Sequence, residues 1–437
     1  MENKRRGFLK LSGLTCLGVA GGGLRLFAST MDKNHHSAIH LSGPDALSAM
    51  GNGNFGEENL SIIGLYGDWA NSINKNKLPT LSLRRKEWSD LEAWKTVAKG
   101  RVADRLAIPE IGGLPKVNVS KQYVFDGLHI EELNWQLPYG RPTEAILLKP
   151  ANAKERLPAI LAFHDHGGNK YFGKRKITKT SEQQHPLMVA HQKEYYEGLA
   201  WANDIAKRGY VVLVSDAFSF ASRRVMMQDV PDHIRHGLND HDPENPVNIE
   251  AYNAWASDHE HIMAKSLFSA GTTWPGVFIA EDLKALDILC AREDVDASRI
   301  GCGGLSGGGI RTVFAAGLDP RIKCSVCVGF MTTWADFLLH KAFTHTWMTY
   351  VPLLPNELDF PEILGLRAPL PALVLNNEED QLFTPSEMRQ ADEILNEVYK
   401  KAGAADHYRC SFYPGPHKFD AKMQAEAFGW FDRWLKG

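Results

Sequence analysis

The sequence predicts an α/β fold, with a mostly parallel central sheet, helices on both of its faces, an N-terminal helical extension and an insertion over the active site. From about residue 121 onward, short and continuously apolar runs alternate with helical segments; residues 157–163 and 210–214 are two such runs. Continuous apolar runs are typical of parallel strands that helices bury on both faces. The chemically distinctive polar residues follow these runs, and sites in open α/β sheets lie at the carboxyl ends of the strands.

The individual elements follow from the same patterns, with apolar residues every three or four positions in helices and short apolar runs in strands. Strands are expected at 128–137, 144–148, 157–163, 210–214, 299–303, 322–328, 372–375 and 408–412. Helices are expected at 195–207, 274–291, 310–318 and 385–401. The stretch from about 217 to 273 is polar, and we expect an irregular insertion that roofs the active site.

The first residues are expected to form a targeting signal and not part of the fold. Arg5 and Arg6 precede an apolar, Gly-rich run over 11–28, which is the layout of a secretory signal of the twin-arginine type. A membrane anchor is disfavoured because Arg25 interrupts the run, and a span needs roughly 20 apolar residues. Lipidation at Cys16 is a weaker alternative, because the residues before it match a lipobox poorly. We therefore expect a periplasmic or secreted protein.

The chain then divides into three parts: a signal peptide over 1–30, a partly helical N-terminal extension over 31–120 and a principal domain over 121–437. Within the extension, apolar residues that include Trp88, Leu91 and Trp94 recur every three or four positions between residues 84 and 108. This spacing predicts an amphipathic helix packed on the principal domain.

The net charge and the cysteine spacing indicate which partners and covalent links to expect. The formal net charge of -3 over 437 residues provides no electrostatic reason to expect a nucleic acid partner. Cys324 and Cys327 are three residues apart in an expected strand, which separates them by about 10 Å. That distance exceeds the roughly 7 Å limit for a disulfide. We expect no disulfide framework, and these two cysteines are expected to be buried on opposite faces of the sheet.

Residues 304–308 read Gly-Leu-Ser-Gly-Gly, a G-x-S-x-G pentapeptide. It lies between an expected strand and an expected helix, which is the context of a nucleophile elbow. The turn is tight, so that a side chain two residues to either side of the serine would clash. We expect Ser306 to be the nucleophile.

A serine hydroxyl requires a base, and the base requires an acid that orients it. Asp380 follows the expected strand 372–375 and precedes a Pro-initiated helix, and it is the preferred acid; Glu379 is the alternative. His417 follows the last expected strand on a Pro- and Gly-rich loop. This Ser, Asp, His order is that of hydrolases built on the elbow.

Two backbone N–H groups are needed to stabilise the oxyanion. The first is expected to be that of Gly307, and the second to come from the loop that follows residues 157–163. In that loop Gly168 is the preferred donor and Gly167 is next. His164 and His166 flank Asp165, which makes a metal site conceivable, but no third group of ligands is evident. No metal and no other cofactor is expected.

These residues resemble the acetyl xylan esterase-like and dienelactone hydrolase-like branch of the α/β hydrolases. The resemblance rests on the His-Asp-His-Gly-Gly run at 164–168, on residues 296–308 and on the Pro-Gly-Pro-His-Lys-Phe run at 414–419, and it extends over about 84–435. It implies an α/β-hydrolase catalytic domain over 121–437 and a cofactor-free Ser-His-Asp esterase. Relatives often have Met or Gln at the position of Gly307. Dienelactone hydrolases proper use a Cys nucleophile, so Ser306 weakens the lactone interpretation.

The expected function is therefore hydrolysis of carboxylic esters through an acyl-enzyme, with acetyl or related esters of carbohydrates as the favoured substrates. His166, Arg224, Trp255 and Trp274 are candidate substrate-binding residues; the alternative is that the tryptophans only pack the insertion onto the sheet. A peptidase of the prolyl oligopeptidase type and a noncatalytic carbohydrate-binding relative are the alternative functions. Fold and triad leave the ester unidentified.

Overall fold

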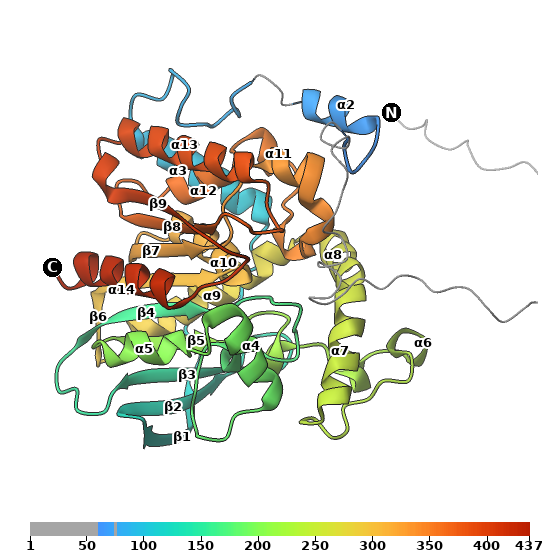
Figure 1. Ribbon diagram of the computed structural model, residues 1–437, viewed down its shortest axis with the longest axis vertical. Coiled ribbons are helices and arrows are strands. Elements are labelled where there is room, and N and C mark those ends of the chain that lie inside the picture. Colours follow the sequence, from blue (N-terminus) through green and yellow to red (C-terminus); the bar gives the residue numbers. More distant parts are fainter. Residues whose placement is uncertain (1–59, 74–76) are drawn as a thin grey trace, which may run out of the picture. The chain divides into compact units, whose positions relative to one another are not determined.

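The computed structural model describes residues 60–73 and 77–437, and they are organised around a nine-stranded sheet (Figure 1). The strand order is β1-β2-β3-β5-β4-β6-β7-β8-β9. The first three strands and the β3–β5 pair are antiparallel, and all the later neighbours are parallel. The strands are β1 (Asn118–Phe125), β2 (Leu128–Trp135), β3 (Thr143–Pro150), β4 (Leu157–Phe163), β5 (Val211–Ser215), β6 (Val295–Leu305), β7 (Ile322–Val328), β8 (Ala372–Asn377) and β9 (Tyr408–Tyr413). The predicted sheet is confirmed, with β1 as an additional edge strand.

Helices cover both faces of this sheet, each over its own hydrophobic core. Residues of α5 and α14, which lie in front of the sheet in Figure 1, belong to one core; residues of α3, α9, α10, α12 and α13 belong to the other. The described helices are α2 (Tyr66–Ser72), α3 (Leu91–Leu106), α4 (Pro186–Tyr196), α5 (Trp201–Lys207), α6 (Asp232–Arg235), α7 (Pro246–Asp258), α8 (Glu260–Ser269), α9 (Trp274–Cys290), α10 (Gly307–Leu318), α11 (Trp334–Asp336), α12 (Phe360–Gly365), α13 (Pro385–Lys401) and α14 (Ala421–Leu435).

The cysteines of β7 behave as the strand period predicts. Cys324 belongs to one core and Cys327 to the other, so they lie on opposite faces of the sheet. Both are buried, free thiols. Burial raises the pKa of the Cys324 thiol, so it stays protonated at neutral pH.

Two predicted segments differ in the structure. The helix expected over 195–207 is interrupted: residues 195–196 end α4, most of which was not predicted, and residues 201–207 form α5. The break occurs because Glu197 takes a left-handed conformation and Gly198 follows it with a φ of 79°. The insertion expected to be irregular contains α7 and α8. These two helices are polar on their exposed sides and bury few apolar residues, so their helical period is weak in the sequence.

The N-terminal extension contributes α2 and α3 among its described residues. The Asp90 side chain accepts hydrogen bonds from the N–H groups of Glu92 and Ala93, which begins α3. Trp94 is fully buried against the main core, and its indole N–H donates to Leu81 O at 2.6 Å. The helix predicted between residues 84 and 108 is thus present. The expected boundary after residue 120 falls inside β1.

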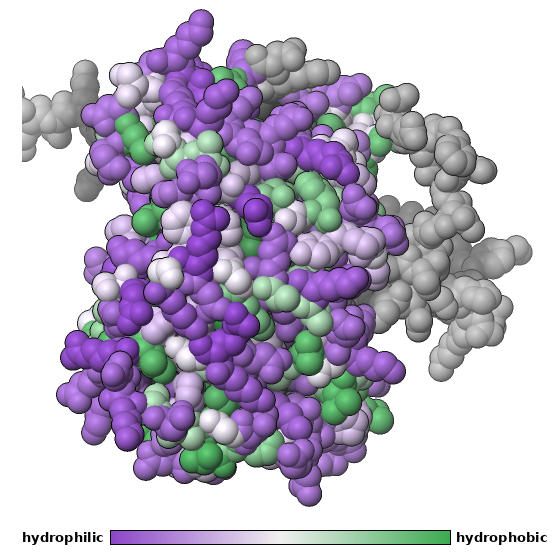
Figure 2. Space-filling model, turned by 60° about the vertical axis from the view of Figure 1, so that its left-hand side comes forward, coloured by the Kyte–Doolittle hydropathy of each residue, from purple (hydrophilic) through white to green (hydrophobic). Residues whose placement is uncertain are grey.

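The expected signal peptide over 1–30 lies outside the described residues. None of the helices that the structure describes is long and apolar enough to cross a bilayer. The face of the molecule in Figure 2 is mainly hydrophilic, with separate small hydrophobic groups between the polar side chains.

Replacing Trp94 by Ala should lower the free energy of unfolding by roughly 3–5 kcal/mol, because it leaves a large cavity under α3. Val97 is 47% exposed on the same helix, so Val97→Ala should change the free energy of unfolding by less than about 0.5 kcal/mol. Denaturant unfolding followed by circular dichroism measures both. Wild-type stability of Trp94→Ala would mean that α3 is not part of the cooperative unit.

Candidate active site

Ser306 occupies the sharp turn between β6 and α10. Its φ and ψ are 56° and -114°, a conformation that residues with a side chain rarely adopt. The Ser306 N–H donates to Val328 O, at the end of the neighbouring strand β7, at 2.9 Å. The serine is half-buried at the carboxyl edge of the sheet. This is the strand–turn–helix context that the pentapeptide predicts.

The glycines of the pentapeptide allow the turn to approach the end of β4. A Cβ atom at Gly304 or at Gly308 would overlap the carbonyl oxygen of Phe163, the last residue of β4. That oxygen belongs to a strand buried in the centre of the sheet and cannot move aside without breaking the packing. Both positions therefore require glycine.

His417 and Asp380 form a close pair. His417 Nδ1 donates to Asp380 Oδ2 at 2.6 Å, and the other carboxylate oxygen accepts the Leu382 N–H at 2.9 Å. Asp380 is 3% exposed. The alternative acid, Glu379, is exposed, and its carboxylate accepts the Gly415 N–H at 3.3 Å. Of the two acids, it is Asp380 that orients the imidazole.

The imidazole lies beside the nucleophile turn. A Cβ atom at Gly329 would be 2.9 Å from His417 Cε1. Gly329 directly follows Val328, whose carbonyl oxygen holds the Ser306 N–H. His417 Nε2 is buried and has no hydrogen-bond partner in the described part of the chain. The nitrogen needed for proton transfer is therefore available at the edge of the sheet where Ser306 lies.

The environment of His417 favours the charged imidazolium. Burial lowers its pKa, but the Asp380 carboxylate raises it by charge and by hydrogen bonding, and Asp165 and Glu194 add to this effect. The net result is a pKa above the ordinary value of 6.5. The His417 imidazole is therefore neutral, and able to accept a proton, only at pH values above this raised pKa.

The loop after β4 brings the backbone of His166 against the nucleophile turn. A Cβ atom at Gly307 would lie 2.8 Å from His166 N, so the missing side chain makes room for this approach. The buried Lys176 ammonium donates to Asp165 O at 2.8 Å and to His166 O at 2.7 Å. In a trans peptide the N–H is directed opposite to the preceding C=O, so the His166 N–H points away from Lys176.

The two glycines expected to donate to the oxyanion are placed differently. The Gly168 N–H donates to His166 Nδ1 at 3.1 Å, and Gly168 is exposed. Its N–H is therefore engaged within the loop. Gly167 has a φ of 48°, and a Cβ atom there would lie 2.5 Å from His191 Cε1. These glycines shape the loop, whereas the backbone in contact with Gly307 is that of His166.

His164 has no nitrogen free for a metal ion. Its Nδ1 donates to Asp165 O at 2.9 Å, and its Nε2 accepts the Ala217 N–H at 3.1 Å. Burial lowers the pKa of His164 to about 3, so it is neutral. Within residues 60–73 and 77–437, no three His, Cys, Asp or Glu side chains are grouped as they would be around a metal ion.

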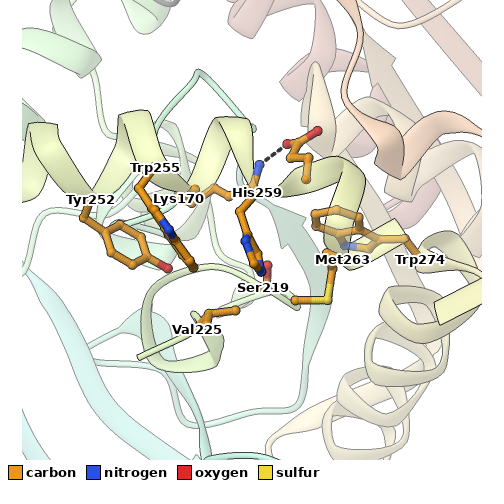
Figure 3. A pocket seen from close by; sticks show the side chains of 10 residues that line it. Lys170, Ser219, Val225, Tyr252, Trp255, His259, Met263 and Trp274 are labelled. Carbon is orange, nitrogen blue, oxygen red and sulfur yellow. Dashed lines mark hydrogen bonds and ion pairs between the residues drawn. The ribbon is translucent and has the colours of Figure 1, made fainter. Parts of the chain in front are cut away.

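Two of the other candidate substrate-binding residues, Trp255 and Trp274, lie at one pocket beside the insertion (Figure 3). Trp255 and Trp274 line a small pocket there, with Tyr252, His259 and Lys170 among its other walls. The Trp255 ring stacks on His259 with centroids 4.3 Å apart, and its indole N–H donates to Ile234 O at 2.9 Å.

Trp274 and Arg224 are also engaged by their surroundings. Trp274 is 1% exposed, and the Arg224 guanidinium lies over the Tyr171 ring at 4.4 Å. Most of the surface of both tryptophans is therefore buried against the protein, as expected if they pack the insertion onto the sheet.

Three charged residues that support this loop were not predicted from the sequence: Lys170, Lys176 and Glu260. Lys170 and Lys176 are 4% and 0% exposed, although they lie in a polar run with two further basic residues that reads as a solvated surface. Glu260 is 90 positions from Lys170 and carries no motif. No local signal in the sequence distinguishes these residues from ordinary surface charges.

No family model matches the chain. It is 28% identical over 309 residues to a Bacillus subtilis (strain 168) protein described as "Putative hydrolase YtaP", covering 70% of this chain and 88% of that protein.

Solved structures share the architecture at low identity. A "putative acetyl xylan esterase" from Bacteroides fragilis NCTC 9343 matches with a TM-score of 0.56 and 16% identity, over 79% of this chain and 81% of its own. A glucuronoyl esterase from Solibacter usitatus matches with a TM-score of 0.56 and 15% identity, over 83% and 98%. The chain has the α/β-hydrolase fold, and its structural neighbours include acetyl xylan and glucuronoyl esterases.

Proposed function

We propose that this protein is a serine esterase that hydrolyses carboxylic esters through an acyl-enzyme. The observation that carries the proposal is the pair of His417 with the buried Asp380 beside a strained serine turn. An unpartnered Nε2 on that histidine supports its role as the base for Ser306. The similarity to a hydrolase and to esterase structures points in the same direction.

The proposed reaction uses each of these groups in turn. His417 Nε2 takes the proton of Ser306, whose oxygen attacks the ester carbonyl, while Asp380 stabilises the imidazolium. The N–H groups of Gly307 and His166 donate to the oxyanion; His166 replaces the expected Gly168 because the Gly168 N–H is engaged. The alcohol leaves with the proton from His417. Water activated by His417 then releases the acid and restores Ser306.

The substrate class that we propose is an acetyl or related ester of a carbohydrate. The names of the structural neighbours support it. The presence of Trp255 and Trp274 in the wall of the pocket also supports it, because their exposed ring atoms provide apolar contacts for a sugar ring. A prolyl oligopeptidase usually carries a β-propeller before this domain; the described residues between 60 and 117 form α2 and α3 and contain no strand. A noncatalytic relative would normally lack a triad residue.

Ser306→Ala should leave the protein folded and lower kcat/KM for p-nitrophenyl acetate by several orders of magnitude, because the nucleophile is lost. His417→Ala should have almost the same effect, and the double variant should lose little more, since the two groups act as a unit. An acetylated xylo-oligosaccharide assayed in parallel tests the substrate class. Wild-type turnover by Ser306→Ala would refute the mechanism, and no turnover of any acetylated sugar would refute the carbohydrate assignment.

The rate of hydrolysis should increase with pH. His417 must be neutral to accept the serine proton, and its pKa is raised above 6.5. The acid limb of kcat/KM should therefore have its midpoint above 6.5, with activity lost as the pH falls below it. Glu194→Gln removes a charge that raises this pKa and should move the midpoint to lower pH. A wild-type midpoint at or below 6.5 would contradict the assignment of His417 as the base.

We also propose that the protein is exported by the twin-arginine route, on the basis of Arg5 and Arg6 before the apolar run. Replacing both arginines by Lys should retain the precursor in the cytoplasm, while lysates keep esterase activity because the substitutions lie outside the catalytic domain. Cell fractionation and blotting for the precursor measure this. Unchanged accumulation outside the cytoplasm would exclude the twin-arginine route.

A further inference from the structure

Glu260, at the start of α8 in the insertion, is the centre of a buried polar cluster. Its Oε1 accepts a hydrogen bond from His166 Nε2 at 2.8 Å and pairs with the Lys170 ammonium. Its Oε2 accepts the Thr346 hydroxyl at 2.8 Å and the Trp347 N–H at 3.0 Å. One carboxylate therefore joins the insertion, the loop after β4 and the segment around residue 346. Glu260 also lines the pocket, and the dashed line from Lys170 in Figure 3 marks the ion pair of this lysine.

The hydrogen bonds determine the protonation of this cluster. His166 Nδ1 accepts the Gly168 N–H, so the ring proton is on Nε2 and donates to Glu260. Burial and the neighbouring Lys170 lower the pKa of His166, which keeps the ring neutral. Burial opposes the charge on Glu260, but Lys170 and His166 outweigh it and hold the pKa of the carboxyl well below its usual range.

The cluster controls the orientation of His166. The Gly168 N–H holds Nδ1 of the ring, and Glu260 accepts from Nε2, which also lies 2.6 Å from the Lys170 ammonium. The carbonyl oxygens of Asp165 and His166, on either side of the His166 N–H, are held by the buried Lys176. The N–H itself belongs to the backbone nitrogen that lies against Gly307. If the Glu260 carboxylate is lost, the Nε2–H group loses its acceptor and faces only the Lys170 ammonium, which is itself a donor. The ring is then no longer held at Nε2, and the residue can rotate about its backbone.

We propose that Glu260 is a positioning residue through which the insertion completes the oxyanion hole. This rests on the proposed esterase function. Glu260 does not touch the reacting atoms; it holds His166 so that its N–H is directed at the oxyanion. Such a role affects the transition state more than substrate binding, because the donor is used only when the carbonyl oxygen becomes negative.

Glu260→Gln tests this role. The substitution keeps the shape of the side chain, but both carboxylate oxygens accept hydrogen bonds, so the NH2 group of the glutamine must face a donor and the hold on His166 is weakened. The kcat for p-nitrophenyl acetate should therefore fall roughly 10-fold to 100-fold, part of the loss seen when an oxyanion donor is removed. KM should stay within about 3-fold, as expected for an interaction that is made mainly in the transition state. Steady-state kinetics and thermal unfolding are measured together on the full chain.

Two further variants separate positioning from general damage. Glu281 is a matched control: it is a buried carboxylate paired with the insertion residue Arg223, and its hydrogen bonds go to Arg223 and Tyr139. Glu281→Gln should lower the free energy of unfolding, because it leaves Arg223 buried without its ionic partner. It should leave kcat within about 2-fold of the wild-type value. The double variant Lys170→Met/Glu260→Gln removes the whole ion pair, so it leaves no buried cation without a partner.

The outcomes distinguish the alternatives. A low kcat in both Glu260 variants, at near-normal KM and with Glu281→Gln active, supports the positioning role. Normal kcat in either folded variant overturns it, as does a raised KM at normal kcat, which would mean that Glu260 binds substrate. Ser306→Ala, assayed alongside, addresses the proposed function: an inactive wild type overturns both proposals, whereas an active wild type with unaffected Glu260 variants overturns only this one.

Discussion

The close approach of two backbone segments is the constraint on which the site depends. The nucleophile turn after β6 packs directly against the end of β4 and the loop that follows it. Gly304 and Gly308 lie against the carbonyl of Phe163, and Gly307 lies against the nitrogen of His166. Any side chain at these positions would force the segments apart. The same contact that requires glycine also places a backbone N–H beside the serine, so packing and the proposed chemistry share one geometry.

Buried charges then hold the loop in this position. Lys176 binds two consecutive carbonyl oxygens of the loop, and Glu260 binds the His166 ring from the insertion. A buried charge is costly unless it is paired and hydrogen-bonded, and each of these groups has several partners. Breaking one contact would leave the others unsatisfied, which makes the loop rigid. The insertion thus does more than cover the sheet: it contributes to the support of the loop.

Much of the fold and of the candidate triad was predictable. Helix α13 begins and ends where its apolar period predicts, and Cys324 and Cys327 lie in separate cores because side chains alternate along a strand. Helices α7 and α8 were not predicted, since their buried faces are narrow and their composition is polar. The break between α4 and α5 was missed because Glu197, which is not a glycine, adopts a left-handed conformation that has no strong sequence signal.

The sequence by itself determined the candidate chemistry: a serine in a glycine-rich strand–helix turn, followed by an acid and a histidine after later strands. Those signals are local, because turn geometry and strand ends depend on neighbouring residues. Only the tertiary structure shows that Asp380, and not Glu379, pairs with His417 and that the Gly168 N–H is engaged while the backbone of His166 lies against Gly307. It also joins Glu260 to Lys170 across 90 residues. Such choices depend on which groups are buried together and which hydrogen bonds remain unsatisfied, and these are properties of the packed chain.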